Sequence, residues 1–234
     1  MDVETVSQPN QNACSECGRK LEGYLAHHFC STCQAPQPLR EGESYFHAFD
    51  LPMKFGLDVA LVQKRFYEIS RELHPDRFVS SSVDDRARSM ARMSFLNQAF
   101  QTLRNSSALR EYILKLYGLR ASGVEMRAEG RQPQKAAMPI ELAESWFELQ
   151  EAVLDDPDQA GVRVIEFEAE LARLKAQGEN RLKSLEAQFD RLPKDAETEI
   201  LAILSQMDAE LQRQNYFRSI EKDVERMKRN VSSV

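Results

Sequence analysis

The sequence predicts an all-α protein made of a small cysteine module, a helical hairpin and a C-terminal three-helix bundle. Three observations predict it: all four cysteines lie near the N-terminus in two close pairs, apolar residues in the middle of the chain recur every three or four positions, and three long amphipathic segments follow. Only nine glycines and few alternating apolar and polar residues are present, which disfavours sheet. We expect the cysteine module at 1–40, the hairpin unit at 41–120, a linker at 121–137 and the bundle at 138–234.

The overall composition is that of a globular protein, with 42% hydrophobic and 29% charged residues among 234. No apolar run approaches the roughly 20 residues that a membrane span requires, and the N-terminus lacks the basic start of a signal peptide. We therefore expect a cytoplasmic protein with no membrane partner, or a mitochondrial one if the source is eukaryotic.

The charge distribution bears on partners. Residues 41–118 carry 11 Lys and Arg against 10 Asp and Glu, whereas residues 119–234 carry 17 against 23. Neither part offers the concentrated basic face that neutralises phosphates, so no nucleic-acid partner is expected. Whether the chain forms a homodimer stays open.

Two C-x-x-C pairs separated by twelve residues account for every cysteine in the chain: Cys14, Cys17, Cys30 and Cys33. This spacing lets two turns present four thiolates to one tetrahedral ion, and it predicts a structural zinc site. Disulfides are the alternative, disfavoured in a reducing compartment, and a redox dithiol would sit beside a βαβ pattern that is absent. His27 and His28 are not needed as ligands. Four thiolates leave no open position for a catalytic water, and a module this small relies on the metal to fold.

Two apolar stripes predict the helical hairpin. The first is a helix that Asp58 is placed to cap, and its stripe consists of Val62, Phe66, Ile69 and Leu73. The second stripe consists of Met93, Leu96, Phe100 and Leu103. The tripeptide His74-Pro75-Asp76 lies between them. Since Pro75 disfavours a helical His74 and cannot continue a helix, the chain turns there and presents His74 and Asp76 to solvent.

This pattern resembles the J-domain from Tyr45 to about Leu119. The matching text is Tyr45-Phe46, the helix that ends in Arg71-Glu72-Leu73-His74-Pro75-Asp76-Arg77-Phe78, and Leu96-Asn97-Gln98-Ala99-Phe100-Gln101-Thr102-Leu103. The segment from Leu109 to Gly118 is similar to the added fourth segment of HscB, the J-protein of iron-sulfur cluster assembly. Some HscB relatives also carry an N-terminal cysteine module.

The resemblance implies a co-chaperone and not an enzyme. It implies docking on a heat-shock protein 70 class chaperone (HscA-like) and stimulation of its ATP hydrolysis. The implied contact residues are the tripeptide and the basic outer face of the preceding helix: His74, Pro75, Asp76, Lys64, Arg65 and Arg71. No G-x-x-x-x-G-K-[ST] loop is present, so the chain itself is not expected to bind nucleotide.

The C-terminal region predicts an antiparallel bundle of three helices, at 139–155, from near 158 to 192, and at about 195–229. On the first helix, one apolar line suits the bundle interior: Leu142, Trp146, Leu149 and Val153. A second apolar line lies about 120° around the same helix: Ile140, Ala143, Phe147 and Leu154. This second line is either a partner surface or a second core contact.

The resemblance to HscB favours a partner surface, because the C-terminal domain of that family binds the iron-sulfur cluster scaffold (IscU-like). The patch maps approximately onto Ala143, Glu144, Phe147, Glu148, Glu151 and Tyr216. Ala143 and Glu144 depart from the larger apolar residues of the family pattern. The alternatives are a J-protein adaptor for another client and, less favoured by the acidic balance, a zinc-ribbon nucleic-acid binder.

Overall fold

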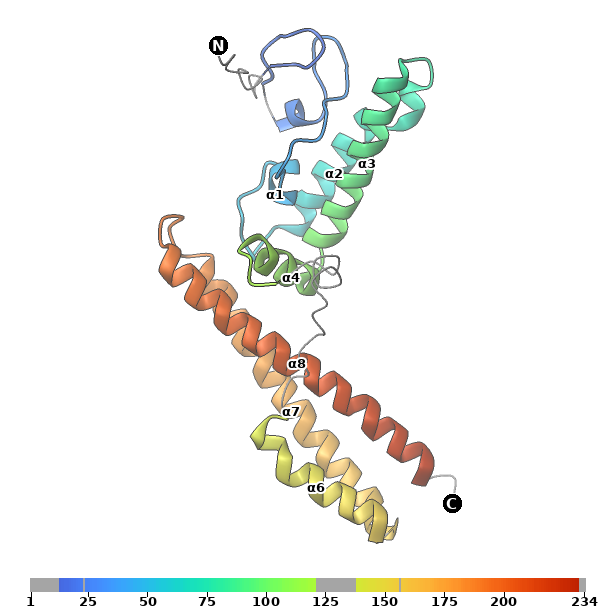
Figure 1. The fold of residues 1–234 in the computed structure, drawn as a ribbon, viewed down its shortest axis with the longest axis vertical. Helices are drawn as coiled ribbons and strands as arrows, with labels where there is room; N and C mark the ends of the chain where they lie inside the picture. The colour runs from blue at the N-terminus through green and yellow to red at the C-terminus, as the bar shows by residue number, and fades with distance from the viewer. Residues whose placement is uncertain (1–12, 23, 121–137, 156, 232–234) are drawn as a thin grey trace, which may run out of the picture. The chain divides into compact units, whose positions relative to one another are not determined.

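The computed structural model describes residues 13–22, 24–120, 138–155 and 157–231, so the linker expected at 121–137 lies outside the described residues. The elements, in chain order (Figure 1), are η1 (Tyr24–His27), α1 (Tyr45–Ala48), α2 (Val59–Leu73), η2 (Pro75–Phe78), α3 (Val83–Leu103), α4 (Ser106–Leu116), α6 (Ile140–Asp155), α7 (Pro157–Phe189) and α8 (Glu197–Val231).

Within these ranges the only β-type pairings are two isolated bridges, which confirms the all-α prediction. No described helix is long and apolar enough to cross a membrane. Packing divides the chain into two compact units, Met1–Tyr112 and Ile113–Val234.

The helical hairpin of the first unit is formed by α2 and α3, which lie side by side (Figure 1). Asp58 caps α2 as predicted, because its carboxylate accepts from the N–H groups of Ala60 and Leu61 at 3.0 and 3.3 Å. Val62, Ile69 and Leu73 of the α2 stripe are buried, and the partly buried Phe66 ring stacks on Phe100 of α3 with centroids 4.3 Å apart. The apolar periodicity therefore predicted this pair of helices correctly.

The buried face of α3 differs slightly from the predicted stripe. Met93 is only partly buried, whereas Ser89 and Arg92 are fully buried on the line that continues through Leu96 and Ala99. A guanidinium and a hydroxyl therefore occupy positions where a core helix usually carries apolar side chains. Their hydrogen-bond partners lie in other segments of the same unit.

The cysteine module contains two turns of the same design, each closed by an isolated bridge, Ala13 with Lys20 and Phe29 with Pro36. In the first knuckle (Cys14–Arg19), Gly18 has φ +68° and donates its N–H to the Cys14 carbonyl at 3.0 Å. In the second knuckle (Cys30–Ala35), Gln34 has φ +60° and donates to the Cys30 carbonyl at 2.8 Å. A left-handed residue thus directly follows each C-x-x-C pair, a conformation that glycine adopts readily and glutamine rarely.

The second unit contains the predicted three-helix bundle. α7 packs against both α6 and α8, and it continues through Gly178 without a break (Figure 1). The core at the α6 end consists of Leu142, Trp146, Leu149, Val164, Phe167, Leu171, Leu174, Phe217, Ile220 and Val224. Its α6 members, Leu142, Trp146 and Leu149, belong to the line that the sequence predicted for the bundle interior.

A buried polar layer interrupts the contact between α7 and α8. Glu210 is 4% exposed and lies 3.4 Å from Arg181 and 3.9 Å from Arg213. Gln214 donates to Glu210 and to the Lys175 carbonyl, both at 3.3 Å. Gly178 provides the space, because a Cβ there would lie 1.9 Å from the Gln214 amide nitrogen. The apolar contact of α7 with α8 is thus divided into two segments.

Candidate functional site

The tripeptide His74-Pro75-Asp76 forms a sharp turn between α2 and η2. α2 ends at Leu73, His74 has φ −57° and ψ 130°, and Pro75 begins η2. The Nδ1 of His74 accepts the Asp76 N–H at 3.3 Å and lies 3.4 Å from the Asp76 carboxylate. The His74 and Asp76 side chains are 55% and 86% exposed, as the proline argument predicted. Both functional groups are therefore available to a partner.

The turn is anchored on both sides. On its N-terminal side, the buried Ser89 hydroxyl of α3 donates to the Leu73 carbonyl at 2.6 Å and so satisfies a backbone acceptor at the end of α2. On its C-terminal side, Phe78 is buried, and Arg77 forms an ion pair with Glu72. An exposed tripeptide is therefore held at a fixed place on a packed hairpin.

The basic residues predicted on α2 fall into two groups. The side chains of Lys64 and Arg71 are exposed. Arg65 instead folds back onto its own unit, where its guanidinium donates to the carbonyls of Phe49 and Asp50, the second at 2.7 Å. Lys64 and Arg71 are thus the residues of this set whose side chains face solvent, and Arg65 helps to position the segment after α1.

The four cysteines come together as one group in which all sulfur atoms lie within 4.8 Å of one another: Cys14, Cys17, Cys30 and Cys33. The sulfurs of Cys14 and Cys33 are 3.6 Å apart, and those of Cys17 and Cys30 are 3.8 Å apart. Four sulfurs about 2.3 Å from one tetrahedral zinc ion would be about 3.8 Å apart, so the observed geometry fits such an ion. The group could therefore hold a metal, and no histidine belongs to it.

The electrostatics of this cluster also favour a cation. Burial of the Cys14 thiol by itself raises its pKa, but hydrogen bonds from the N–H groups of Cys17 and Glu16 and from the side chains of Cys33 and Gln37 together lower the pKa to about 6. Burial, reinforced by the neighbouring thiols, raises the pKa of Cys33 to about 12. Thiolates this close repel one another, so a bound cation is needed before all four sulfurs can be ionised.

His28 attaches the module to the hairpin unit and does not serve as a ligand. Its side chain is fully buried, and its Nε2 donates to the Ala48 carbonyl at the end of α1, at 2.6 Å. Burial lowers the pKa of His28 to about 4, so the ring is neutral near pH 7. The expectation that His27 and His28 would not be ligands agrees with the four-cysteine group, but the structural role of His28 was not foreseen.

Arg92 is a second attachment that the sequence analysis missed. It donates to the Gln37 carbonyl at 2.8 Å and to the Pro38 carbonyl, and it pairs with both carboxylate oxygens of Glu43 at 2.7 and 2.9 Å. Burial lowers the pKa of Arg92, and Glu43 offsets part of that effect. A signal was present, because Arg92 lies four residues before Leu96 on the predicted apolar stripe, where a charge indicates a buried partner.

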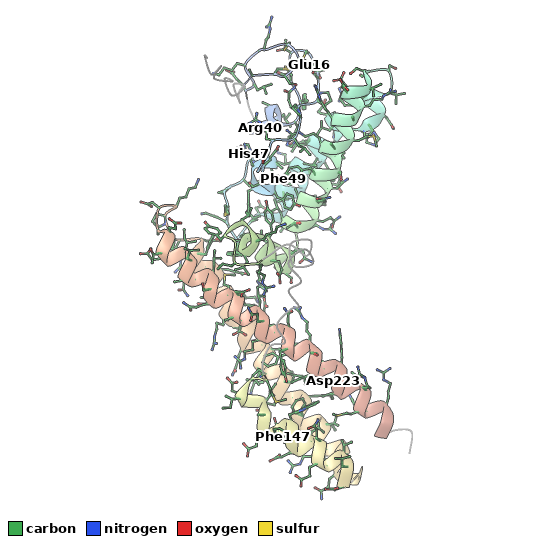
Figure 2. All side chains as sticks on the ribbon, in the orientation of Figure 1. Glu16, Arg40, His47, Phe49, Phe147 and Asp223 are labelled. Carbon is green, nitrogen blue, oxygen red and sulfur yellow. The ribbon has the colours of Figure 1, made fainter. Side chains whose placement is uncertain are left out.

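The second apolar line of α6 is exposed within its own unit. Ile140, Phe147 and Leu154 are 86%, 63% and 82% exposed, whereas Ala143 is only partly buried. Figure 2 labels Phe147 on α6. The alternative in which both lines are core contacts is therefore not what the structure of this unit shows.

The remaining residues of the predicted patch are mostly exposed as well. Glu144 and Glu151 are exposed, and Glu148 is 3.5 Å from Arg163 of α7. Tyr216 of α8 is partly buried against the bundle core, and burial raises its pKa. The predicted patch thus consists of an exposed aromatic side chain, Phe147, with exposed acidic residues on the same helix.

Comparison with known proteins supports the resemblance to HscB. No model of a known protein family matches the chain. The chain is 30% identical over 152 residues to the co-chaperone protein HscB homolog of Psychromonas ingrahamii, covering 64% of this chain and 86% of that protein. It is 28% identical over 171 residues to the HscB homolog of Vibrio cholerae, covering 73% of this chain and 95% of that protein.

Two solved structures resemble the fold. The crystal structure of human co-chaperone protein HscB covers 92% of this chain and 98% of its own, with a TM-score of 0.60 and 22% identity. Chaperone HscB from Vibrio cholerae covers 80% and 99%, with a TM-score of 0.50 and 25% identity. The J-type hairpin with its exposed tripeptide, the helical bundle and the similarity to HscB homologues place the chain in the class of J-domain co-chaperones. Within that class, the chain belongs to the HscB co-chaperone family.

Proposed function

We propose that this protein docks on a heat-shock protein 70 class chaperone of the HscA type, stimulates its ATP hydrolysis and delivers an iron-sulfur cluster scaffold of the IscU type. The observation that carries the proposal is the tripeptide, whose Asp76 carboxylate is 86% exposed on a turn anchored by Ser89 and Phe78. A fixed, solvated carboxylate can make a charge-assisted contact with the chaperone at little conformational cost. Family membership supports the co-chaperone role.

Lys64 and Arg71 extend this docking surface along α2. They are seven residues apart, so they project from the same side of the helix about two turns from one another. Exposed cations at this spacing would steer the protein toward an acidic chaperone surface and make association depend on salt. Arg65 contributes mainly by holding the Phe49–Asp50 segment beside α2.

The outer face of α6 is the proposed scaffold site. Phe147 provides an exposed aromatic anchor, Ile140 and Leu154 extend the apolar line, and Glu144 and Glu151 supply acidic groups on the same helix. An exposed apolar patch rimmed by charge is typical of a partner site. Ala143 and Glu144 depart from the larger apolar residues of the family pattern, so Phe147 should carry most of the contact.

The cysteine group is proposed to bind one zinc ion in a structural role. Four thiolates complete a tetrahedral shell, and the two knuckles contribute two sulfurs each. The metal supplies folding free energy to the module. In this proposal the functional divisions are 1–40, 41–120 and 138–234, the protein is not an enzyme, and it acts in the cytoplasm or, in a eukaryote, the mitochondrion.

The test combines an ATPase assay with a pull-down on purified full-length protein. The chain should stimulate the chaperone's ATPase, and purified scaffold should bind the wild-type protein but bind Phe147→Ala more weakly. Stimulation without scaffold binding would indicate a J-protein adaptor for another client. Absence of stimulation would contradict the co-chaperone activity itself.

A further inference from the structure

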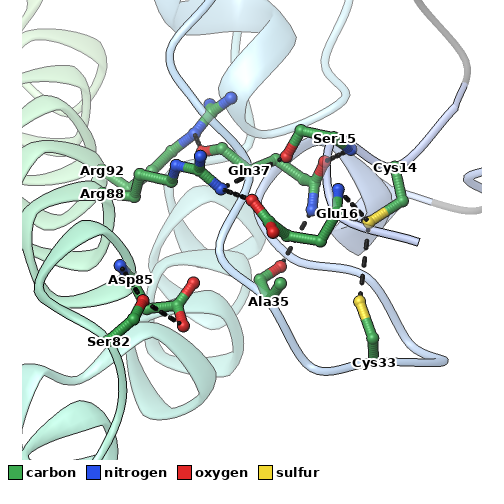
Figure 3. A network of polar contacts seen from close by, with 10 residues as sticks. All are labelled: Cys14, Ser15, Glu16, Cys33, Ala35, Gln37, Ser82, Asp85, Arg88 and Arg92. Atoms are coloured by element: carbon green, nitrogen blue, oxygen red, sulfur yellow. Dashed lines mark hydrogen bonds and ion pairs between the residues drawn. The ribbon is translucent and has the colours of Figure 1, made fainter. Parts of the chain in front are cut away.

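Gln37 is one of the buried residues that fasten the cysteine module to the hairpin. Its side-chain amide donates to the Cys14 sulfur at 3.4 Å and to the Ala35 carbonyl at 2.9 Å, and its amide oxygen accepts the Ser15 N–H at 3.0 Å. Its backbone carbonyl accepts from Arg92 of α3 at 2.8 Å. Figure 3 shows this network. Gln37 therefore contacts a metal-ligating sulfur and the J-type hairpin at the same time.

The hairpin side of this contact reaches toward the tripeptide. Arg92 and Ser89 lie one turn apart on the buried face of α3. Ser89 donates to the carbonyl of Leu73, the residue directly before His74. A second link, between Arg88 of α3 and Glu16 of the first knuckle, is visible in Figure 3. The same helix face thus holds the cysteine module at one position and the end of α2 at another.

The second knuckle also borders η2, the short helix that begins within the tripeptide. A groove of about 190 Å³ lies between them, with Gln34 and Ala35 on the module side and Arg77 and Phe78 of η2 on the other. Cys33, one of the four sulfur ligands, lines it too. The second knuckle therefore lies beside the C-terminal half of η2, the helix whose first two residues are Pro75 and Asp76 of the tripeptide.

Folding of the module depends on metal binding, and this dependence can couple the metal site to the hairpin. With metal bound the knuckles are folded, whereas a module of this size without metal loses most of its folding free energy. On unfolding, Arg92 loses the Gln37 and Pro38 carbonyls, and the groove beside η2 loses one wall. The first change occurs one helical turn from Ser89, which holds the end of α2, and the second occurs beside η2; neither alters the residues of the proposed chaperone surface.

We propose that metal binding at the four cysteines and chaperone docking at the His74-Pro75-Asp76 turn are thermodynamically coupled, with Gln37 and Arg92 as the positioning residues that join the two sites. The inference rests on the proposed function, because it takes the heat-shock protein 70 class chaperone as the docking partner. Coupling between sites is reciprocal, so each ligand tightens the binding of the other by one common factor.

The first test compares zinc-loaded full-length protein with protein stripped of metal and freed of chelator before the assay. ATPase stimulation over a concentration series separates the half-saturating concentration from the maximum rate. Metal removal should raise the half-saturating concentration about fivefold or more, and added zinc should restore it. An unchanged value overturns the coupling and leaves the proposed function intact, whereas no stimulation by loaded protein overturns the proposed function and the coupling with it.

The second test measures zinc affinity by competition with a chromophoric chelator, with and without ATP-loaded chaperone. Reciprocity requires the zinc affinity to rise with chaperone by the same factor by which zinc tightens chaperone binding. A zinc affinity that the chaperone leaves unchanged overturns the inference. This readout does not depend on ATPase activity.

The third test isolates Gln37. Gln37→Met keeps the length of the side chain but removes the donor to the Cys14 sulfur, so zinc affinity should fall about tenfold. At limiting zinc the variant should need more protein for half-maximal stimulation, and excess zinc should rescue it. Lys20→Ala is the control, because Lys20 belongs to the same module and pairs with Glu22 on its surface. Wild-type zinc affinity in Gln37→Met would overturn the positioning role.

Discussion

Replacing Phe147 by alanine should weaken scaffold binding with little loss of stability. Complete burial of a phenylalanine side chain contributes about 1.5–3 kcal/mol. Since Phe147 is 63% exposed, a partner that covers it would gain about 1–2 kcal/mol, or about 5- to 30-fold in Kd. The part already buried within the bundle contributes only about 0.5–1 kcal/mol to the free energy of unfolding.

The neighbouring residue provides the matched control. Trp146 is 8% exposed and packs on Phe167 with ring centroids 5.4 Å apart, so Trp146→Ala should cost about 3–5 kcal/mol of stability. Calorimetric titration of each full-length variant with purified scaffold gives the affinity, and denaturant unfolding gives the stability. The reasoning fails if Phe147→Ala unfolds the bundle while the affinity per folded molecule stays at the wild-type value. The scaffold site would then lie elsewhere.

Three further predictions test the first unit. Asp76→Asn should abolish ATPase stimulation. Because the Asp76 side chain is 86% exposed, the substitution should change the free energy of unfolding by no more than about 0.5 kcal/mol. Undiminished stimulation would mean that the tripeptide is only a structural turn. Elemental analysis should find one zinc per wild-type chain and almost none in Cys17→Ser, while the free energy of unfolding of the helical bundle stays the same in both. Wild-type zinc content in the variant would refute the four-thiolate site. Glu43→Gln should lower the free energy of unfolding by about 3 kcal/mol, because it leaves the Arg92 guanidinium buried without its counter-ion. The control, Glu22→Gln, changes an exposed side chain and should alter stability by less than about 0.5 kcal/mol. Equal effects of the two variants in thermal unfolding would contradict this account.

The features that the sequence predicted well depend on interactions between residues that are close together in the chain. The period of 3.6 residues determines which side chains share a helix face, so the stripe from Val62 to Leu73 is found without knowing its partner. Pro75 acts on its immediate neighbours, and the end of α2 at Leu73 follows from it. The two C-x-x-C pairs likewise fix local turn geometry, and the four sulfurs come together as expected.

The features that were missed depend on contacts between distant segments. Arg92 and the Gln37 carbonyl are 55 positions apart, and nothing in either neighbourhood specifies the pairing. The two apolar lines of α6 could be identified from the sequence, but which line is buried depends on where α7 and α8 lie. Arg65 is a similar case, since its periodicity placed it with Lys64 and only the fold directs it to Phe49 and Asp50.

The polar layer between α7 and α8 determines how these two long helices align. In the observed antiparallel arrangement, Glu210 lies opposite Gly178, within reach of Arg181. A slip of one heptad in either direction would bring the buried carboxylate against Leu171 or Leu185 in place of the glycine notch. Burying an unpaired carboxylate among leucines costs several kcal/mol, so both shifted alignments are strongly disfavoured. A single glycine and the glutamate opposite it thus select one register from several that the repeating apolar pattern alone would allow.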